Sequence, residues 1–355
     1  MFLYDLFLIF LQNVFFEPFA FLQPLTFGHF LTVLPLHKDF FAFFLYSRRF
    51  CVEFIIYYKK KIFRDIIYRM SSNGKIGMIN SKEFCSVVKK LRAFFDSKGF
   101  VEVHTQSRLS ILAACEDPTT ISTYNYAGQV WPLPQTGQMW LEYEMLTNKD
   151  EAPGYYCLST SFRNEPNPVE GRHDKVFPMF EFEIRGGMDE LQKMEQELLT
   201  HLGFDKFYQN GEYPEGDYVD VAEKYGVKEL ENEHEEKLKE DHGPVFFLKN
   251  FPNYTSPFWN MKQHDEKGKA NKIDVIIQGI ETIGSAERSC DPEEMRKQFY
   301  SISDGGYANI LFSNFTKDRV EKELNEFLGF KFMDRSGGGI GVTRLIRAMK
   351  LSGLL

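Results

Sequence analysis

Two apolar segments separated by a polar loop place the strongest constraint on how this chain folds. Residues 155–162 and 177–184 are rich in aromatic and β-branched side chains, and the stretch between them is rich in Pro, Asn, Gly and charge. This pattern predicts a long antiparallel hairpin with a mobile loop. Arg163 and Glu165 on the first strand would then lie near Phe177 and Met179 on the second.

Such a set of side chains on one sheet face suits a nucleotide. A guanidinium can hold a phosphate, and an aromatic ring can stack on a base. The loop adds Arg172 and His173 to the same region. The alternative for this segment is a surface hairpin with ordinary cross-strand ion pairs.

A run of glycines near the carboxyl end is the second informative feature. Residues 336–341 hold four glycines, which let a backbone approach a ligand closely. Apolar residues between Ile340 and Met349 have a spacing suited to a helix. Arg344, fixed where that helix begins, can hold a phosphate bidentately. By itself such a run is also typical of a turn or a helix cap.

Two acidic residues lie in a second predicted hairpin. β-Branched runs flank Gln278 and Gly279, which makes Asp274 and Glu281 near cross-strand neighbours. Facing carboxylates repel each other unless a cation lies between them. Magnesium bridging ATP phosphates fits this arrangement. A solvated acidic pair remains the alternative from spacing alone.

The order and spacing of these segments resemble motifs 2 and 3 of class II aminoacyl-tRNA synthetases, within the aspartate/asparagine/lysine subgroup. The resemblance covers residues 81–355 and rests on a Phe-Arg-x-Glu…Arg-His…Phe…Glu-x-Glu hairpin and a Gly-Gly-Gly-Ile-Gly-x-x-Arg-Leu end. It implies an α+β fold, in which helices flank an antiparallel β-sheet. It also implies a ligase that uses ATP and Mg²⁺ to form an aminoacyl-adenylate.

The resemblance assigns the catalytic arginines. Arg163 would neutralise the α-phosphate of ATP and align the amino-acid carboxylate, which attacks the phosphorus as pyrophosphate leaves. Arg344, together with Arg172 and His173, would hold the γ-phosphate. This chemistry needs positioning and charge neutralisation rather than a nucleophilic Ser or Cys.

Four further residues complete the implied ATP and metal site. Phe177 would stack on adenine from one side, and Glu165 would accept a hydrogen bond from the adenine amino group. Asp274 and Glu281 would bind the magnesium ion, so that Glu281 belongs to the ATP site as well.

The segment at 133–142 resembles the part of these enzymes that holds the amino acid. Its Thr-Gly-Gln-x-x-x-Glu form is closer to asparaginyl than to aspartyl enzymes. Aspartyl enzymes carry a lysine three residues after the glutamine, and Leu141 stands there in this chain. Arg288 matches the arginine that reads the substrate side chain. We expect Gln138 and Arg288 to hold aspartate or asparagine, with Glu142 as a candidate for reading an amide.

Three departures from the family pattern affect assembly and partners. Motif 1 is expected as a helix over Phe84–Phe95 followed by a strand, but Gln106 stands where a proline normally marks the dimer interface. Val176 replaces the glutamate that usually precedes the adenine-stacking phenylalanine. Nothing resembles the anticodon-binding β-barrel that precedes the core in this subgroup. A homodimer is still expected.

The first 69 residues differ from the rest of the chain. They contain sixteen of its thirty-six phenylalanines, interrupted by prolines and acidic residues, without the roughly 20 apolar residues of a membrane span. They also lack the pattern of a secretory signal. We expect residues 1–69 not to be genuine coding sequence. A membrane-associating or targeting extension and an unfamiliar folded unit are the alternatives.

Residues 70–355 are expected to form one catalytic domain with an acidic insertion at about 186–244. The first 69 residues carry eight basic and five acidic side chains, so the −8 of the whole chain leaves about −11 for the rest. Such an acidic surface binds tRNA poorly in general, although a local basic patch would suffice. The five cysteines lack paired spacing, which indicates a reducing compartment and favours the cytoplasm. No membrane partner is predicted.

Three functions remain open from the sequence. The first is a synthetase-like ligase that passes its adenylate to tRNA. The second is an asparagine synthetase, in which aspartyl-adenylate passes to ammonia and no anticodon module is needed. The third is a binding module that kept the fold and lost catalysis. The third is disfavoured by the joint presence of six residues that the activity would use: Arg163, Phe177, Asp274, Glu281, Arg288 and Arg344.

Overall fold

The computed structural model describes residues 79–105, 109–112, 120–169 and 171–355. The predictions for residues 1–69 and for Gln106 lie outside these residues. The strands are β1 (Val101–Glu102), β2 (Thr123–Tyr126), β3 (Gln129–Pro132), β4 (Gly154–Phe162), β5 (Val176–Arg185), β6 (Glu215–Asp217), β7 (Val245–Pro252), β8 (Lys269–Ile277), β9 (Ile280–Glu287) and β10 (Arg335–Gly341). The helices are α3 (Ser81–Ser97), α4 (Gln138–Thr147), α5 (Met188–Leu202), α6 (Tyr218–Tyr225), α7 (Asn232–His242), α8 (Pro292–Ser301), α9 (Gly306–Phe315), α10 (Lys317–Leu328) and α11 (Val342–Leu351). Short 3₁₀ turns are η1 (Ser110–Leu112), η3 (Phe204–Phe207), η4 (Asn253–Thr255) and η5 (Ile302–Gly305).

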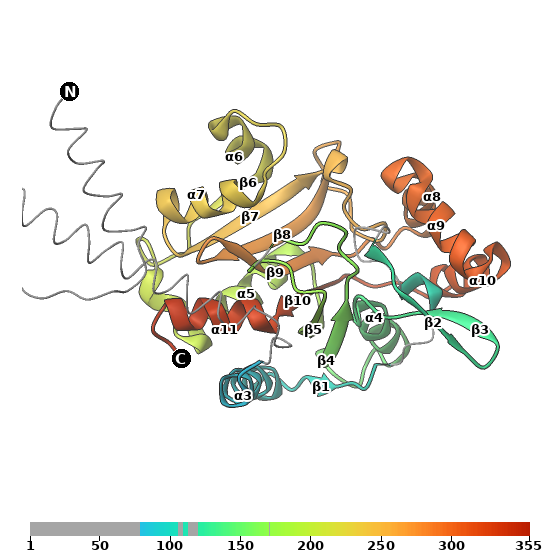
Figure 1. Ribbon diagram of the computed structural model, residues 1–355, viewed down its shortest axis with the longest axis horizontal. Helices are drawn as coiled ribbons and strands as arrows, with labels where there is room; N and C mark the ends of the chain where they lie inside the picture. Colours follow the sequence, from blue (N-terminus) through green and yellow to red (C-terminus); the bar gives the residue numbers. More distant parts are fainter. Residues whose placement is uncertain (1–78, 106–108, 113–119, 170) are drawn as a thin grey trace, which may run out of the picture. The chain divides into compact units, whose positions relative to one another are not determined.

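One large sheet organises the described residues. Its strand order is β1-β4-β5-β10-β9-β8-β7-β6, while β2 and β3 pair separately. The pairs from β4 to β7 are antiparallel, and the outer pairs β1–β4 and β6–β7 are parallel (Figure 1). The prediction of an α+β fold with an antiparallel sheet flanked by helices is confirmed. That the chain lacks an anticodon-binding barrel stays a prediction.

The first predicted hairpin is formed by β4 and β5, with Ser161 opposite Phe177. Arg163 and Glu165 were expected on the first strand, but they follow Phe162, where β4 ends. The backbone N–H of Arg163 still donates to the carbonyl of Lys175, and the pairing ends at Asn164, whose N–H donates to the carbonyl of Thr120. Arg163 therefore lies just beyond the end of β4, where the loop to β5 begins.

The second predicted hairpin is formed by β8 and β9. Gln278 and Gly279 connect the strands with φ angles of 54° and 77°, as a two-residue turn of the primed type requires. The register shifts between Val275 and Ile276, so Asp274 lies opposite Gly284 rather than opposite Glu281. Because Asp274 and Ile276 share one face of β8 and Glu281 lies opposite Ile276, the two acidic side chains lie on the same face of the sheet.

The glycine run forms β10, a central strand, and not a turn or a helix cap. The helix expected from Ile340 begins at Val342. Side chains of the neighbouring strands fill the space that a β-carbon needs: at Gly337 it would lie 1.8 Å from Oε2 of Glu183, and at Gly338 2.5 Å from Cβ of Ser285. Only glycine fits at these positions, so the run is a packing requirement of the sheet centre.

The main core lies between the sheet and helices α3, α5 and α11. Helix α3 begins after Asn80, whose side chain accepts from the N–H groups of Lys82 and Glu83. Its buried residues recur at helical spacing, and Phe95 stacks on Phe180 and Phe182 of β5. The helix predicted over 84–95 is confirmed, with an earlier start. The residues of β5 that alternate with Phe180 and Phe182 face the opposite side.

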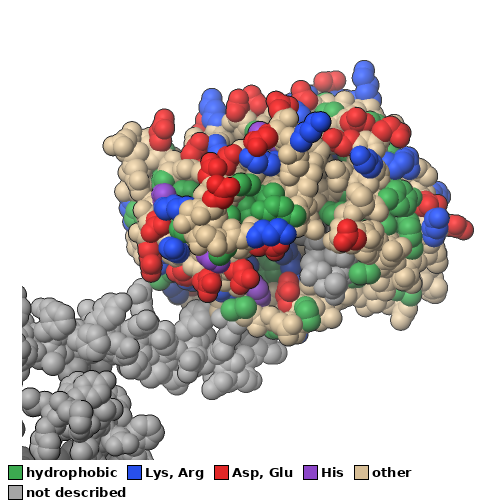
Figure 2. Space-filling model, turned by 90° about the horizontal axis from the view of Figure 1, so that it is seen from above, with side chains coloured by type: hydrophobic (Ala, Val, Ile, Leu, Met, Phe, Trp, Pro, Cys, Tyr) green, Lys and Arg blue, Asp and Glu red, His purple; other side chains and the backbone are tan. Residues whose placement is uncertain are grey.

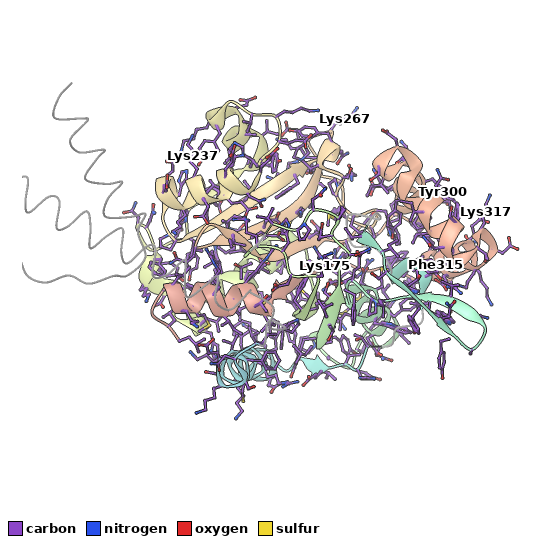
Figure 3. The ribbon with its side chains drawn as sticks, viewed as in Figure 1. Lys175, Lys237, Lys267, Tyr300, Phe315 and Lys317 are labelled. Atoms are coloured by element: carbon purple, nitrogen blue, oxygen red, sulfur yellow. The ribbon has the colours of Figure 1, made fainter. Side chains whose placement is uncertain are left out.

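Helices α8, α9 and α10 form a second core with α4 and η1. Trp259 is fully buried there, with the rings of Phe299 and Phe327 edge-on to it. Figure 3 marks these helices by the labels of Tyr300, Phe315 and Lys317. Among the described residues, no helix is long and apolar enough to cross a membrane.

The segment at 186–244 contains two different parts. Helix α5 belongs to the main core through residues such as Leu191 and Leu198. The part from β6 to α7 packs as a separate small cluster against β7 and β8. Figure 2, seen from the side of α6 and α7, shows acidic and basic side chains scattered over this face. That the segment is an insertion stays a prediction.

Candidate functional site

Segments far apart in the sequence surround one open pocket on the sheet face opposite the main core. All seven residues predicted for the ATP site lie in its wall. We call it the arginine pocket, and its lining residues are Arg163, Glu165, Arg172, His173, Asp174, Phe177, Met179, Glu281, Thr282, Gly339, Gly341, Thr343 and Arg344.

Arg163 and Phe177 form one wall of the arginine pocket. The guanidinium carbon of Arg163 lies 5.7 Å from the centre of the Phe177 ring. The backbone N–H of Arg163 donates to the carbonyl of Lys175, which is labelled near the centre of Figure 3. Val176 beside them is exposed, so the glutamate that it replaces would also have faced solvent. A cation and an aromatic ring therefore share one side of the pocket, as a nucleotide requires.

Arg344 lies in the first turn of α11 and reaches β9. Its Nη1 donates to the carbonyl of Glu281 at 2.8 Å and lies 3.3 Å from Oε2 of the same residue. Burial acts to raise the pKa of Glu281, but Arg344 and then Lys272 outweigh it and hold the pKa below its usual value. Glu281 is therefore a carboxylate, and it presents negative charge at the edge of the pocket.

Arg172 and His173 lie in the loop between β4 and β5 and line another part of the arginine pocket. Arg172 donates to Oε2 of Glu235 at 2.6 Å and to the carbonyl of Gly279 at 3.1 Å. Burial lowers the pKa of His173, and the nearby Arg344 lowers it further. At neutral pH, His173 is therefore an uncharged group, and the arginines supply the positive charge.

The two carboxylates predicted to bind metal approach one point. A β-carbon at Gly284 would lie 2.7 Å from Oε1 of Glu281 and 3.5 Å from Oδ1 of Asp274, so both carboxylates occupy the same sheet face. Lys272 lies 3.2 Å from the other oxygen of Asp274. The described residues contain no group of three or more His, Cys, Asp or Glu side chains placed to hold a metal. Two carboxylates fit Mg²⁺ when phosphate and water supply the remaining oxygens.

A second group of charged side chains lies over the glycines of β10. We call it the buried cluster, and its members are Gln138, Glu142, Glu183, Arg288 and Arg335. Nη2 of Arg288 donates to Oε1 of Gln138, and Nε2 of Gln138 donates to the carbonyl of Gly338 at 2.8 Å. The structure thus brings together all three residues predicted to bind the amino acid.

Glu142 is held by other protein groups. Its Oε2 accepts from Nη2 and Nε of Arg335 at 2.7 and 3.0 Å, and its Oε1 accepts from Asn260 at 2.6 Å. Its distance to Nε of Arg288 is longer, at 3.9 Å. Glu142 therefore acts on Arg288 through charge, and both of its oxygens already have protein donors.

Two glutamates of β5 were quoted in the sequence pattern without a role. Glu181 accepts from the backbone N–H of Gly137 at 2.8 Å and from the hydroxyls of Thr136 and Ser159. Glu183 lies 3.5 Å from Arg288, and burial raises its pKa to about 8 against the opposing effect of that arginine. Their two-residue spacing puts both on the pocket side of the strand, which is the signal that could have identified them.

Known proteins with similar sequences are aminoacyl-tRNA ligases. An aspartate–tRNA(Asp/Asn) ligase of Methanopyrus kandleri is 25% identical over 57% of this chain and 51% of its own length. An aspartate–tRNA(Asp) ligase of Pyrobaculum aerophilum is 24% identical over 74% of this chain and 62% of its own length. The chain thus spans between half and two thirds of the length of these relatives.

Solved structures show the same fold. Asparaginyl-tRNA synthetase from Pyrococcus horikoshii, complexed with asparaginyl-adenylate, matches with a TM-score of 0.62 and 21% identity. That match covers 75% of this chain and 64% of the other. The family model for class II tRNA synthetases (D, K and N) matches residues 77–352. This chain therefore belongs to the class II tRNA synthetases of the D, K and N group.

Proposed function

We propose that this protein activates aspartate or asparagine with ATP to form an aminoacyl-adenylate. One observation carries the proposal: Arg163, Phe177 and Arg344 come from three distant segments and line one pocket together with Glu281. A pocket with guanidinium groups, an aromatic ring and a carboxylate suits a nucleoside triphosphate, whose phosphates pair with guanidinium and whose base stacks on a ring. The buried cluster beside it suits a small charged or amide side chain.

The arginine pocket acts mainly by position and charge. The amino-acid carboxylate attacks the α-phosphorus, and Arg163 neutralises the charge that develops on the phosphoryl oxygens. Phe177 stacks on adenine, and Glu165 accepts from its amino group. Arg172 and Arg344 hold the γ-phosphate by charge, and the neutral His173 forms a hydrogen bond with the same phosphate. Asp274 and Glu281 are the residues that would hold Mg²⁺, which would neutralise the phosphate charge.

The buried cluster selects the amino acid in this proposal. Gln138 and Arg288 hold the substrate, because Arg288 can pair with a carboxylate or donate to an amide oxygen. Glu142 remains a candidate for reading an amide, through its effect on Arg288. Leu141 is buried and offers no charge. Aspartate and asparagine are therefore the proposed substrates, and a cationic amino acid is not.

The proposed acceptor is tRNA, as the names of the relatives suggest. Two residues of motif 1 form a short edge strand, β1, after α3, which supports a homodimer through that edge. The free thiols of Cys85, Cys157 and Cys290 support a reducing compartment, so we place the reaction in the cytoplasm. We also keep the proposals that residues 70–355 are the catalytic domain and that residues 1–69 are dispensable.

The test is ATP–pyrophosphate exchange by the full chain with each of the twenty amino acids. We expect Mg²⁺-dependent exchange with aspartate or asparagine. Adding tRNA should then yield aminoacyl-tRNA, whereas product formation with ammonia alone would identify an asparagine synthetase. A chain that starts at Met70 should be as active as the full chain. Absence of exchange with every amino acid would contradict adenylate formation.

A further inference from the structure

Helix α7, which no part of the proposed mechanism uses, reaches the arginine pocket through one carboxylate. Oε2 of Glu235 accepts a hydrogen bond from Nη2 of Arg172 at 2.6 Å and another from the backbone N–H of Glu281 at 2.8 Å. Arg172 belongs to the loop after β4, and Glu281 belongs to β9. A single oxygen atom therefore joins two walls of the pocket to a helix outside it.

The guanidinium of Arg172 is held at both terminal nitrogens. Nη1 donates to the carbonyl of Gly279 while Nη2 donates to Glu235, and the arginine side chain is only 13% exposed. Its Nε is buried and has no hydrogen-bond partner among the described residues. Arg172 is thus fixed in the pocket wall, with its Nε–H among the donors that these bonds leave unused.

The turn between β8 and β9 is shaped to admit α7. Gly279 has a φ of +77°, and a β-carbon there would lie 2.6 Å from a carboxylate oxygen of Glu236. The other oxygen of Glu236 lies 3.8 Å from both Arg172 and Arg347. The carboxylate of Glu236 therefore lies against the turn, and Glu235 reaches the backbone of Glu281 from the same helix. Figure 3 locates this helix by the label of Lys237.

We propose that Glu235 is a positioning residue for the ATP phosphates, holding Arg172 and the backbone of Glu281 in the arrangement that receives them. This inference rests on the proposed use of ATP by the arginine pocket. An arginine that is already ordered by a charge-assisted hydrogen bond loses little further freedom when phosphate binds. The bond to the Glu281 N–H fixes the start of β9, from which that carboxylate projects.

An inhibitory role for Glu235, or a purely structural one, predicts a different experimental result. If Glu235 instead competed with phosphate for Arg172, removal of its charge would free the arginine and tighten ATP binding. If the pair only stabilised the fold, its removal would lower the melting temperature and leave the Michaelis constants in place. The sign and the substrate dependence of the change therefore separate the three roles.

The experiment compares Glu235→Gln with Glu233→Gln in the full chain. Glu233 lies on the same helix with its side chain 81% exposed, so the control removes the same charge from solvent. We expect Glu235→Gln to raise the KM for ATP about tenfold, with a change below about twofold in the KM for the amino acid. The control, Glu233→Gln, should change neither the KM for ATP nor the KM for the amino acid. Glu235→Asp, which keeps the charge, should fold like the parent and raise the KM for ATP less.

A double-mutant cycle identifies the path of the effect. In an Arg172→Ala background, Glu235→Gln should add little to the KM for ATP, because the partner is already absent. Equal ATP constants for Glu235→Gln and the control, or a lower constant for Glu235→Gln, would overturn the proposal. If the parent binds ATP but performs no exchange, the proposed function fails while the dissociation constants for ATP still decide the role of Glu235. A parent that binds no ATP overturns both.

Discussion

In the arginine pocket the charged side chains keep part of their surface in solvent, whereas in the buried cluster they have almost none. The side chain of Arg344 is 29% exposed, and that of Arg335 is fully buried. Arg344 donates to the carbonyl and the carboxylate of Glu281 and to the carbonyl of Arg172, while Arg335 pairs with the buried Glu142. Both regions lie on one face of one sheet, so burial rather than strand position distinguishes them.

This difference in exposure determines whether a charged side chain contributes mainly to ligand binding or mainly to the stability of the fold. A buried ion pair cannot lose one partner without leaving an uncompensated charge in a medium of low dielectric constant. A half-exposed arginine can lose its partner to water at little cost. Substitutions in the buried cluster should therefore act first on stability, and substitutions in the arginine pocket should act first on activity.

The largest effect is expected for Arg335→Met. It leaves Glu142 buried without its guanidinium and should lower the free energy of unfolding by about 3–5 kcal/mol. Arg92→Met is the matched control: Arg92 pairs with Glu102 at 2.7 Å and both side chains are 39% exposed, so its loss should cost less than about 1 kcal/mol. Denaturant titration of both variants measures the difference. Equal losses would remove the basis of the comparison.

Arg163→Ala should give the reverse pattern. Loss of a charge partner of the transition state should lower kcat by at least about a hundredfold, because the group stabilises charge that develops only during reaction. The free energy of unfolding should stay within about 0.5 kcal/mol of the parent, as for surface substitutions. Exchange kinetics and denaturant titration on the same sample test this. A variant with a large loss of stability and normal kcat would contradict it.

A buried carboxyl away from both regions tests the role of burial by pH. Glu195 of α5 is fully buried, and burial raises its pKa to about 8, against a smaller opposing effect of Ser285. The folded state then keeps a proton that the unfolded chain releases above its ordinary pKa near 4.5. Stability from this group is therefore lost as pH rises from about 4.5 to 8, by up to about 1.4 kcal/mol per pH unit.

Glu195→Gln removes that titration. The variant and the parent should have similar stability near pH 4.5, and the variant should become increasingly the more stable one up to about pH 8. Thermal unfolding across this range supplies the measurement. A difference that stays constant with pH would show that Glu195 does not hold a proton in the folded state.

The smallest predicted effect concerns the aromatic wall of the arginine pocket. Phe177→Leu keeps an apolar side chain but removes the ring beside Arg163, so the KM for ATP should rise by roughly fivefold to tenfold, as for loss of one base-stacking contact. The KM for the amino acid should not change. Met179→Leu, in the same wall, is the control and should leave both constants near those of the parent.

Much of the sheet could be predicted from the sequence because its signals are local. Alternating aromatic residues gave β4 and β5, and the Gln278–Gly279 dipeptide gave the turn between β8 and β9. The glycine strand β10 could not be predicted in this way. Its glycines are required by side chains of β5 and β9 that are remote in sequence, and local rules assign glycine to turns.

The residues of the site also divide into those that local sequence patterns predict and those that they do not. Arginines and aromatics in a recognisable order were enough to collect the residues of the arginine pocket. The contact between Glu235 and Arg172 joins residues 63 positions apart, through a helix whose composition indicates only a solvated surface. The protein partners of Glu142 likewise depend on Arg335, far along the chain. Burial of charge is set by tertiary packing, so it has no local signature.

The most direct test of the account is a crystal structure of the full chain with a non-hydrolysable analogue of aspartyl- or asparaginyl-adenylate. We expect adenine on the ring of Phe177, the phosphate mimic at Arg163, and the amino-acid side chain at Arg288 in the buried cluster. An analogue bound away from the arginine pocket, or bound there with its amino-acid side chain remote from Arg288, would contradict it.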